Sequence, residues 1–183
     1  MKWMIFLGQI PSSPSTLRVM VWRRMRDAGA LGLQNGLWVL PANEEYSRFA
    51  DELRHYLEEH GASCLVFRVD AVEGVTDEEI VDRLRAERDE EYREFIERCG
   101  VLLEDLKTET EQSRFNFAEL EEAEADLKKL DSWWEKCVRR DFVGGTLKAK
   151  AEAKLQASHQ AYETFSIHVY ERHAAAPETE PTT

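Results

Sequence analysis

The stretch LRVMVWRRMRDAGALGLQNGLWVLP, Leu17 to Pro41, predicts how the chain begins to fold. Its first half has apolar residues at offsets of four, four and three, the spacing of one helix face: Leu17, Val21, Met25 and Ala28. Gly29 follows this face and is typical of a helix end. The pair Asn35-Gly36, flanked by apolar residues, is a strong hairpin signal. The stretch therefore predicts a helix followed by two short paired strands, or by one long bulged strand.

The residues on either side extend this order of elements. The apolar run from Trp3 to Ile10 predicts a buried strand, and Ser13 before Pro14 predicts that the helix starts there and runs to about residue 28. Strands are expected at 30–34 and 37–40, a second helix from the cap Asn43 to Gly61, and a strand from about residue 63. The order βαββαβ predicts an α+β chain with a ferredoxin-like sheet domain.

The character of the sequence changes after residue 75. Thr76 opens the segment TDEE, which is typical of a capped helix start, and no proline occurs between residues 77 and 173. Three long helices are expected at about 77–106, 116–141 and 147–171. We therefore predict a ferredoxin-like domain at 2–75 and an extended helical region at 76–173. The composition of residues 174–183 predicts a disordered tail.

Charge is distributed unevenly along the 183 residues, whose net charge is −12. Residues 1–42 carry five basic and one acidic group, whereas residues 43–183 carry 19 basic and 35 acidic groups. The overall acidity argues against bulk non-specific binding of nucleic acid, although a local basic face could still bind phosphate or an oxyanion. Three widely spaced cysteines and no membrane-length apolar run predict a reduced cytoplasmic protein that has no zinc site and does not contact a membrane.

The candidate ligand-binding residues are basic and aromatic. On the first helix, Arg18, Trp22 and Arg26 form a stripe beside the core face, Arg23 lies on the outer face, and Arg24 lies where it needs a partner. Such a surface suits an anion or a DNA backbone, with Trp22 as a stacking plate. A second basic cluster contains Arg139 and Arg140. The alternative is that both clusters are solvated helix faces whose arginines pair with the abundant glutamates.

Catalysis has little support in the sequence. A metal-dependent nuclease needs carboxylates at strand ends, but the first strand ends at Gln9, and Asp70 has no evident partner. No nucleotide-binding loop or nucleophile motif is present. We expect a protein that is not an enzyme and that has no cofactor and no metal.

Three segments resemble the N-terminal domain of the ChrB family of chromate-resistance regulators. The opening stretch resembles the family's helix-and-hairpin pattern at these positions: Leu17, Arg18, Val19, Trp22, Arg23, Gly29, Asn35, Gly36, Trp38, Leu40 and Pro41. A later acidic helix matches at Arg88, Asp89 and Tyr92, and a further segment matches at Arg140, Asp141 and Phe142. The resemblance covers about residues 2–172 and extends distantly to PaaX-type repressors and to small CRISPR adaptation nucleases.

The resemblance implies a non-enzymatic regulator linked to chromate resistance. We expect it to act in transcriptional control by binding promoter DNA, chromate or a similar oxyanion through the first helix. A homodimer is expected, with Trp133 or Trp134 as an exposed anchor. The alternative is a protein–protein interaction module that uses its acidic helices and has no ligand of its own.

Overall fold

The computed structural model describes residues 1–13, 15–34 and 36–174. The chain forms two compact units. The first, called the sheet unit, comprises Met1–Arg88 and Arg139–Gly144. The second, called the helical unit, comprises Asp89–Val138 and Gly145–Thr183. The predicted domain boundaries, after residues 75 and 173, stay predictions. The predicted tail at 174–183 lies outside the described residues except for Ala174, the last residue of a helix.

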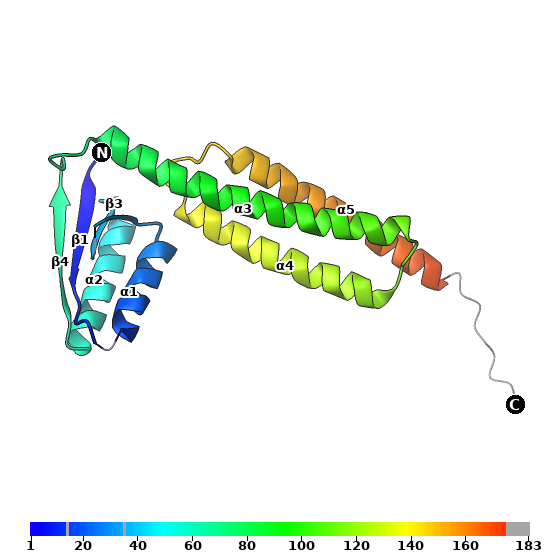
Figure 1. Cartoon of the computed structure of the whole chain (residues 1–183), viewed down its shortest axis with the longest axis horizontal. Helices are drawn as coiled ribbons and strands as arrows, with labels where there is room; N and C mark the ends of the chain where they lie inside the picture. Colours follow the sequence, from blue (N-terminus) through cyan, green and yellow to red (C-terminus); the bar gives the residue numbers. More distant parts are fainter. Residues whose placement is uncertain (14, 35, 175–183) are drawn as a thin grey trace, which may run out of the picture. The chain divides into compact units, whose positions relative to one another are not determined.

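The sheet unit contains four antiparallel strands in the order β2-β3-β1-β4. They are β1 (Trp3–Gln9), β2 (Leu31–Gln34), β3 (Leu37–Pro41) and β4 (Ser63–Val69). Figure 1 labels three of them, β1, β3 and β4. A register shift between Gly32 and Gln34 marks a bulge in β2. Gly36 adopts a φ of 78° at the turn into β3, a conformation that glycine tolerates best. The predicted mixed fold class is confirmed at this level, as strands and helices share one chain.

Two helices cover one face of this sheet: α1 (Thr16–Asp27) and α2 (Glu44–Glu59). Val21 and Met25 of α1 are buried, as the apolar spacing predicted. The cap of α2 is also confirmed, because the Asn43 side chain accepts a 2.8 Å hydrogen bond from the Tyr46 backbone. The predicted start of α1 is wrong. The helix begins at Thr16 after Ser15, whose side chain makes no cap hydrogen bond, and Pro14 lies outside the described residues.

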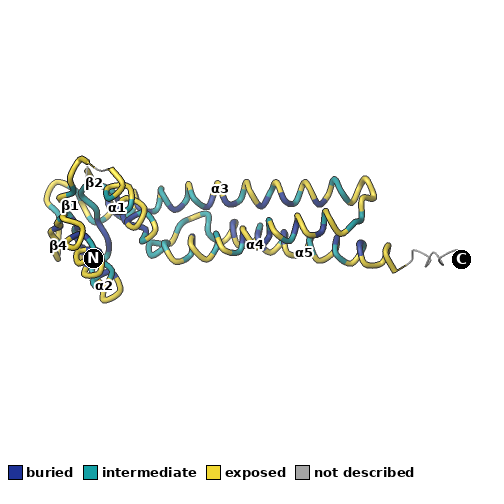
Figure 2. Tube along the Cα trace, turned by 90° about the horizontal axis from the view of Figure 1, so that it is seen from below, coloured by how far each residue is buried: buried dark blue, intermediate teal, exposed yellow. Residues whose placement is uncertain are grey.

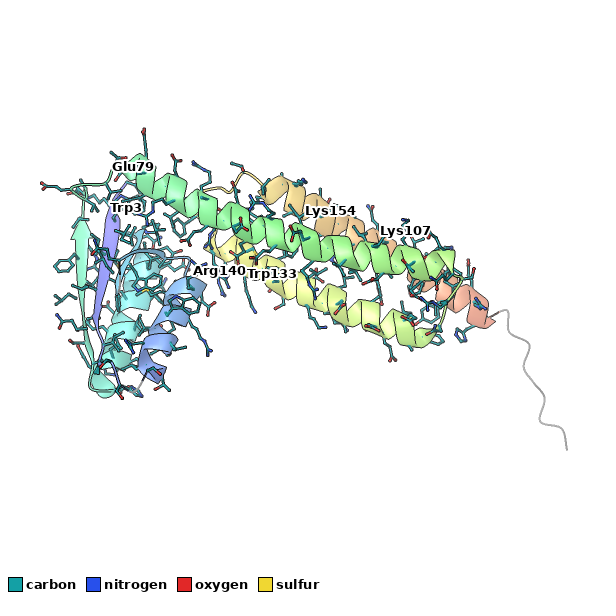
Figure 3. All side chains as sticks on the ribbon, viewed as in Figure 1. Trp3, Glu79, Lys107, Trp133, Arg140 and Lys154 are labelled. Atoms are coloured by element: carbon teal, nitrogen blue, oxygen red, sulfur yellow. The ribbon has the colours of Figure 1, made fainter. Side chains whose placement is uncertain are left out.

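The opposite face of the sheet is only partly covered. Trp3, Leu31 and Val39 pack there against Ile80 and Leu84 from the first turns of α3 (Asp77–Glu111). The indole of Trp3, labelled in Figure 3, also donates a 2.6 Å hydrogen bond to Asp77. Farther along the same face, on β4, Leu65 and Phe67 are 47% and 46% exposed.

The helical unit consists of the remainder of α3 together with α4 (Phe117–Arg140) and α5 (Lys148–Ala174). The three helices lie side by side, and their buried positions recur along facing stripes (Figure 2). Their shared core contains these residues: Tyr92, Phe95, Cys99, Leu102, Leu106, Leu120, Ala123, Leu127, Leu130, Cys137, Ala151, Leu155, Phe165 and Val169. The three predicted helices are confirmed, with α3 extending five residues beyond its expected end.

The prediction that Trp133 or Trp134 is exposed is wrong. Both rings are half-buried against the helical core, with centroids 5.4 and 5.5 Å from that of Phe95. Aromatic rings at such separations gain from packing as well as from burial. These tryptophans therefore stabilise the unit that contains them and are poor anchors for a second copy.

Candidate functional site

The candidate surface is the outer side of α1. Val21 and Met25 are buried on its inner side, Trp22 and Arg24 flank that side, and Arg23 lies opposite it. Arg18, Trp22 and Arg23 are all exposed, and Trp22 retains 54% of its accessible area. Neither Arg18 nor Arg23 forms an ion pair with any described residue of the chain. This exposed set of one large aromatic ring and two cations is here called the α1 surface.

A groove of about 600 Å³ runs beside the α1 surface. Its lining comprises Gly8, Ile10, Ser15, Arg18, Val19, Val21, Trp22, Gly36 and Trp38. The Arg18 guanidinium lies at this groove and donates a 2.8 Å hydrogen bond to the Ser12 carbonyl. That bond orients the arginine while leaving other N–H donors of the guanidinium available. The groove therefore joins an oriented cation to two indole rings.

Arg26 does not share the environment of Arg18 and Trp22. Its Nη1 lies 2.6 Å from Oε2 of Glu87, and both side chains are partly shielded from solvent. The same carboxylate oxygen lies 3.6 Å from Nη2 of Arg88, which is only 3% exposed. The charge of Arg26 is thus neutralised within the sheet unit. The predicted stripe is divided into an outward part, Arg18 and Trp22, and an ion-paired part.

The structure brings Arg24 and Arg139, one from each predicted basic cluster, to a second cavity of about 430 Å³. The cavity is not uniformly positive, since it is also lined by three acids: Asp27, Glu45 and Glu52. The Arg24 guanidinium lies 4.8 Å from the ring centroid of Tyr56, an ordinary cation–π distance. The partner that Arg24 was expected to need is therefore an aromatic ring.

Tyr46 is a buried residue that also lines this second cavity. Burial and, to a smaller extent, the neighbouring charge of Glu45 together raise the pKa of its phenol to about 12, against the opposing charges of Arg88 and Arg139. The phenol therefore stays neutral at physiological pH. It offers a hydrogen-bonding hydroxyl and no charge.

Arg140 has a structural role. Its Nη2 lies 3.2 Å from Oδ1 of Asp27, and its side chain is 17% exposed (labelled in Figure 3). Its backbone carbonyl also passes close to Gly29, where a β-carbon would lie 2.9 Å from that oxygen. Residues 139–144 are thereby held against the end of α1 within the sheet unit. Of the second basic cluster, Arg139 faces the second cavity and Arg140 is ion-paired.

The family model described as "Protein ChrB, N-terminal" matches residues 18–176, from the first arginine of the α1 surface through α5. The chain belongs to this family. Membership of the ChrB N-terminal family supports a role related to chromate resistance. No curated protein matches the chain.

Two residues of this ChrB-family chain, Trp38 and Arg88, were named in the family resemblance but were not predicted to lie near the site. Trp38 was assigned to a strand, but its ring faces α1 and lines the groove. Arg88 is buried, and its position four residues after buried Leu84 and four before buried Tyr92 was an available signal. In both cases the missing information was which face of the element turns toward its neighbour.

Within residues 1–13, 15–34 and 36–174, no three His, Cys, Asp or Glu side chains are grouped so that they could hold a metal ion. None of the helices formed by those residues is both long enough and apolar enough to cross a membrane. Asp70, considered above as a nuclease carboxylate, is exposed and lies 3.5 Å from Lys2.

Proposed function

We propose that this chain is a non-enzymatic regulator in chromate resistance that binds DNA, an oxyanion or both through the α1 surface and acts in transcriptional control. The observation that carries the proposal is the difference among the arginines of one helix. Arg26 is ion-paired, whereas Arg18 and Arg23 point outward beside an exposed tryptophan with no carboxylate partner among the described residues. Cations left unpaired in an acidic protein are available for a ligand.

The distribution of charge supports binding at this position. The sheet unit holds 13 basic and 15 acidic residues, whereas the helical unit holds 11 basic and 21 acidic residues. A phosphate backbone gains affinity from cations and is repelled by carboxylates. An anionic ligand would therefore bind the sheet unit rather than the helical unit.

We also propose that the sheet unit is ferredoxin-like. The strand order β2-β3-β1-β4 and the placement of two helices on one face support this assignment. In such a unit α1 follows the first strand, and its outer side is free to face a ligand.

We further propose that the chain forms a homodimer. Its interface is the uncovered part of the sheet face opposite α1 and α2. Leu65 and Phe67 are exposed there, and β4 pairs them with Leu7 and Ile5 of β1. None of these four residues carries a charge. Two copies of a chain with a net charge of −12 would repel each other least across such a neutral apolar face. Light scattering at micromolar concentration should give twice the 21.2 kDa chain mass, and Phe67→Lys should give the monomer.

The main experiment measures binding of promoter DNA and of chromate by Arg18→Ala, Arg23→Ala and Arg24→Ala. If the α1 surface binds a phosphate backbone, Arg18→Ala and Arg23→Ala should each weaken binding modestly at every DNA sequence and should flatten the salt slope by about one unit. Arg24→Ala should weaken binding less, because Arg24 lies outside that surface and packs on Tyr56. If the α1 surface binds a chromate-like dianion, each loss should be steeper because charge-assisted hydrogen bonds are stronger.

Arg54→Ala is the matched control for these variants. Arg54 is an exposed arginine of the same unit, but it lies on α2 within 3.5 Å of both Asp51 and Glu58. The Arg54→Ala variant should therefore bind promoter DNA and chromate as the parent does. The proposal fails if the three α1 variants also bind both ligands as the parent does, or if the parent binds neither.

An interaction module remains the second candidate function, because the helical unit exposes apolar side chains. Phe117, Ile167 and Tyr170 are 40%, 52% and 59% exposed. If the chain is an interaction module, Tyr170→Ala should reduce chromate resistance of cells, whereas the variants of α1 should not.

A further inference from the structure

The groove beside α1 has mostly apolar walls. Trp22 and Trp38 contribute indole rings, and Ile10, Val19 and Val21 contribute aliphatic side chains. Of the described residues that line it, Arg18 alone carries a charge. A ligand that fills this groove must therefore present a large apolar surface and a small anionic part.

These walls are poorly matched to a bare oxyanion. A compact dianion is held by several charge-assisted hydrogen bonds that converge on it. The groove offers one guanidinium, and Nη2 of that guanidinium already donates to the Ser12 carbonyl. Each of the two indoles could add at most one N–H donor, and the flat faces of their rings gain nothing from stacking against a tetrahedral ion.

Two glycines leave the room that a flat ring needs. A β-carbon at Gly8 would lie 3.2 Å from Cδ1 of Ile10, and one at Gly36 would lie 3.1 Å from the Gly8 carbonyl oxygen. Both positions border the groove, so a side chain at either would crowd it. The volume of about 600 Å³ is in the range of small-ligand sites.

We infer that this groove binds a nucleotide, with the base stacked on the indole of Trp22 and the phosphate paired with Arg18. Nucleobases stack on aromatic side chains irrespective of sequence, and a guanidinium pairs well with phosphate. The inference rests on the proposed function and deepens it, because it names an unpaired nucleotide as the part of DNA that enters the site. A free mononucleotide has the same chemistry and is the other possible source of the ligand.

The experiment compares four probes with the full chain: a labelled single-stranded dodecamer of thymidines, its duplex with a complementary strand, adenosine monophosphate, and chromate. Anisotropy measures binding of the two oligonucleotides, and calorimetry measures binding of the two small ligands. The parent should bind the single strand more tightly than the duplex. Binding of adenosine monophosphate in addition would identify a free nucleotide as a ligand, whereas binding of the single strand alone would identify the DNA.

Variants of the groove test the stacking directly. Trp22→Ala should weaken single-strand binding about tenfold, the loss expected for one stacked base. Trp22→Phe should restore most of the affinity because it retains an aromatic face. Arg23→Ala is the matched control, since Arg23 is an exposed cation of the same helix that does not line the groove. It should weaken single-strand and duplex binding to the same modest extent.

The outcomes separate this inference from the proposed function. If the parent binds duplex or chromate but neither the single strand nor the mononucleotide, the inference is wrong and the proposed function stands. If Trp22→Ala binds the single strand as the parent does, the inference is also wrong. If the parent binds none of the four probes and also does not bind promoter DNA, both fail; if it binds promoter DNA alone, only the inference fails. Because Trp22 is exposed, an unchanged melting temperature of Trp22→Ala should show that any loss of binding is local.

Discussion

The sheet unit carries a net charge of −2, whereas the helical unit carries a net charge of −10. In the helical unit, five basic side chains pair with carboxylates of the same unit: Arg93, Lys107, Arg114, Lys128 and Lys129. Lys148, Lys150 and Lys154 on α5 form no ion pair among the described residues. In the sheet unit, Arg18, Arg23 and Arg24 lie on one helix, and none of them has an ion-pair partner among the described residues. The helical unit holds nearly as many basic residues as the sheet unit. Whether a basic side chain is available to a ligand therefore depends on the side chains around it, and a count of basic residues does not measure this.

The two units also differ in how they build their cores. The sheet unit buries apolar residues on both faces of its sheet, in two separate clusters. The helical unit buries a single cluster along three helices. The α1 surface is therefore supported by the cluster beneath it, which includes Phe6, Val21 and Met25. The cores are local, so each unit should respond mainly to damage of its own core.

The largest expected effect comes from emptying one core at a time. Phe6 in the sheet unit and Phe95 in the helical unit are both fully buried. Phe6→Ala and Phe95→Ala should each cost about 3–5 kcal/mol, because each removes an aromatic ring and leaves a cavity. Hydrogen exchange measured by segment should rise in 3–69 for the first variant and in 89–138 for the second. Equal increases in both segments for either variant would show that the two units do not respond separately.

The next effect concerns a glycine that fixes the end of α1. Gly29 has a φ of 77°, and a β-carbon there would lie 2.9 Å from the Arg140 carbonyl oxygen. Gly29→Ala should cost about 3 kcal/mol, because backbone strain is added to a steric overlap. Gly61→Ala is the matched control, with a φ of 70° and no atom within 4 Å of the added carbon. Chemical denaturation should give a clearly smaller loss for Gly61→Ala, and equal losses would remove the contact with Arg140 from the explanation.

Most of the fold could be predicted from local sequence signals. The spacing of apolar residues and the caps at Asn43 and Thr76 act within one or two turns of chain, so one segment is enough to recognise them. The start of α1 was missed for a related reason. Serine is a residue type that often caps helices, so the sequence favours Ser13 as the cap. The backbone conformation decides where a helix starts, and this helix begins at Thr16.

The candidate site was less predictable, because it depends on contacts between distant segments. Arg26 and Glu87 are 61 residues apart, and Arg140 and Asp27 are 113 residues apart. A helical wheel places Arg18 and Arg26 on one stripe, yet it cannot show which of them meets a carboxylate. The exposure assigned to Trp133 and Trp134 was wrong for the same reason, since it is Phe95 on another helix that covers them.

A smaller effect distinguishes the buried tyrosine of the sheet unit from one in the helical unit. Burial raises the pKa of Tyr46 to about 12, so the folded chain keeps this proton while the unfolded chain loses it near pH 10. Stability from Tyr46 is therefore present below pH 10 and is lost as pH rises toward 12, by about 2 kcal/mol.

Tyr46→Phe should remove this part of the alkaline loss, as measured by denaturation at pH 8 and pH 11.5. Tyr162 of the helical unit is the comparison, because burial and the nearby Glu124 also raise its pKa, although less strongly. Tyr162→Phe should change the pH dependence less than Tyr46→Phe does. The reverse order would show that burial of Tyr46 does not govern its titration.

The smallest effect separates two helix starts. At the start of α3, in the sheet unit, Thr76 and Glu79 cap each other: the Thr76 backbone donates to Glu79 at 2.7 Å, and the Glu79 backbone donates to the Thr76 hydroxyl at 3.1 Å. At the start of α4, in the helical unit, Asn116 accepts one 3.1 Å bond from the Glu119 backbone. Thr76→Ala and Asn116→Ala should each lower the free energy of unfolding by about 1 kcal/mol.

The two helix starts differ in how their stability responds to pH. The hydrogen bonds from the Thr76 backbone and then from its hydroxyl lower the pKa of Glu79, so its contribution is present at neutral pH and is lost as pH falls through that lowered pKa. Glu79→Gln should therefore melt below the parent at pH 7, and the gap should close in acid. A gap of the same size at pH 7 and pH 3 would mean that the charge of Glu79 has no part in the cap.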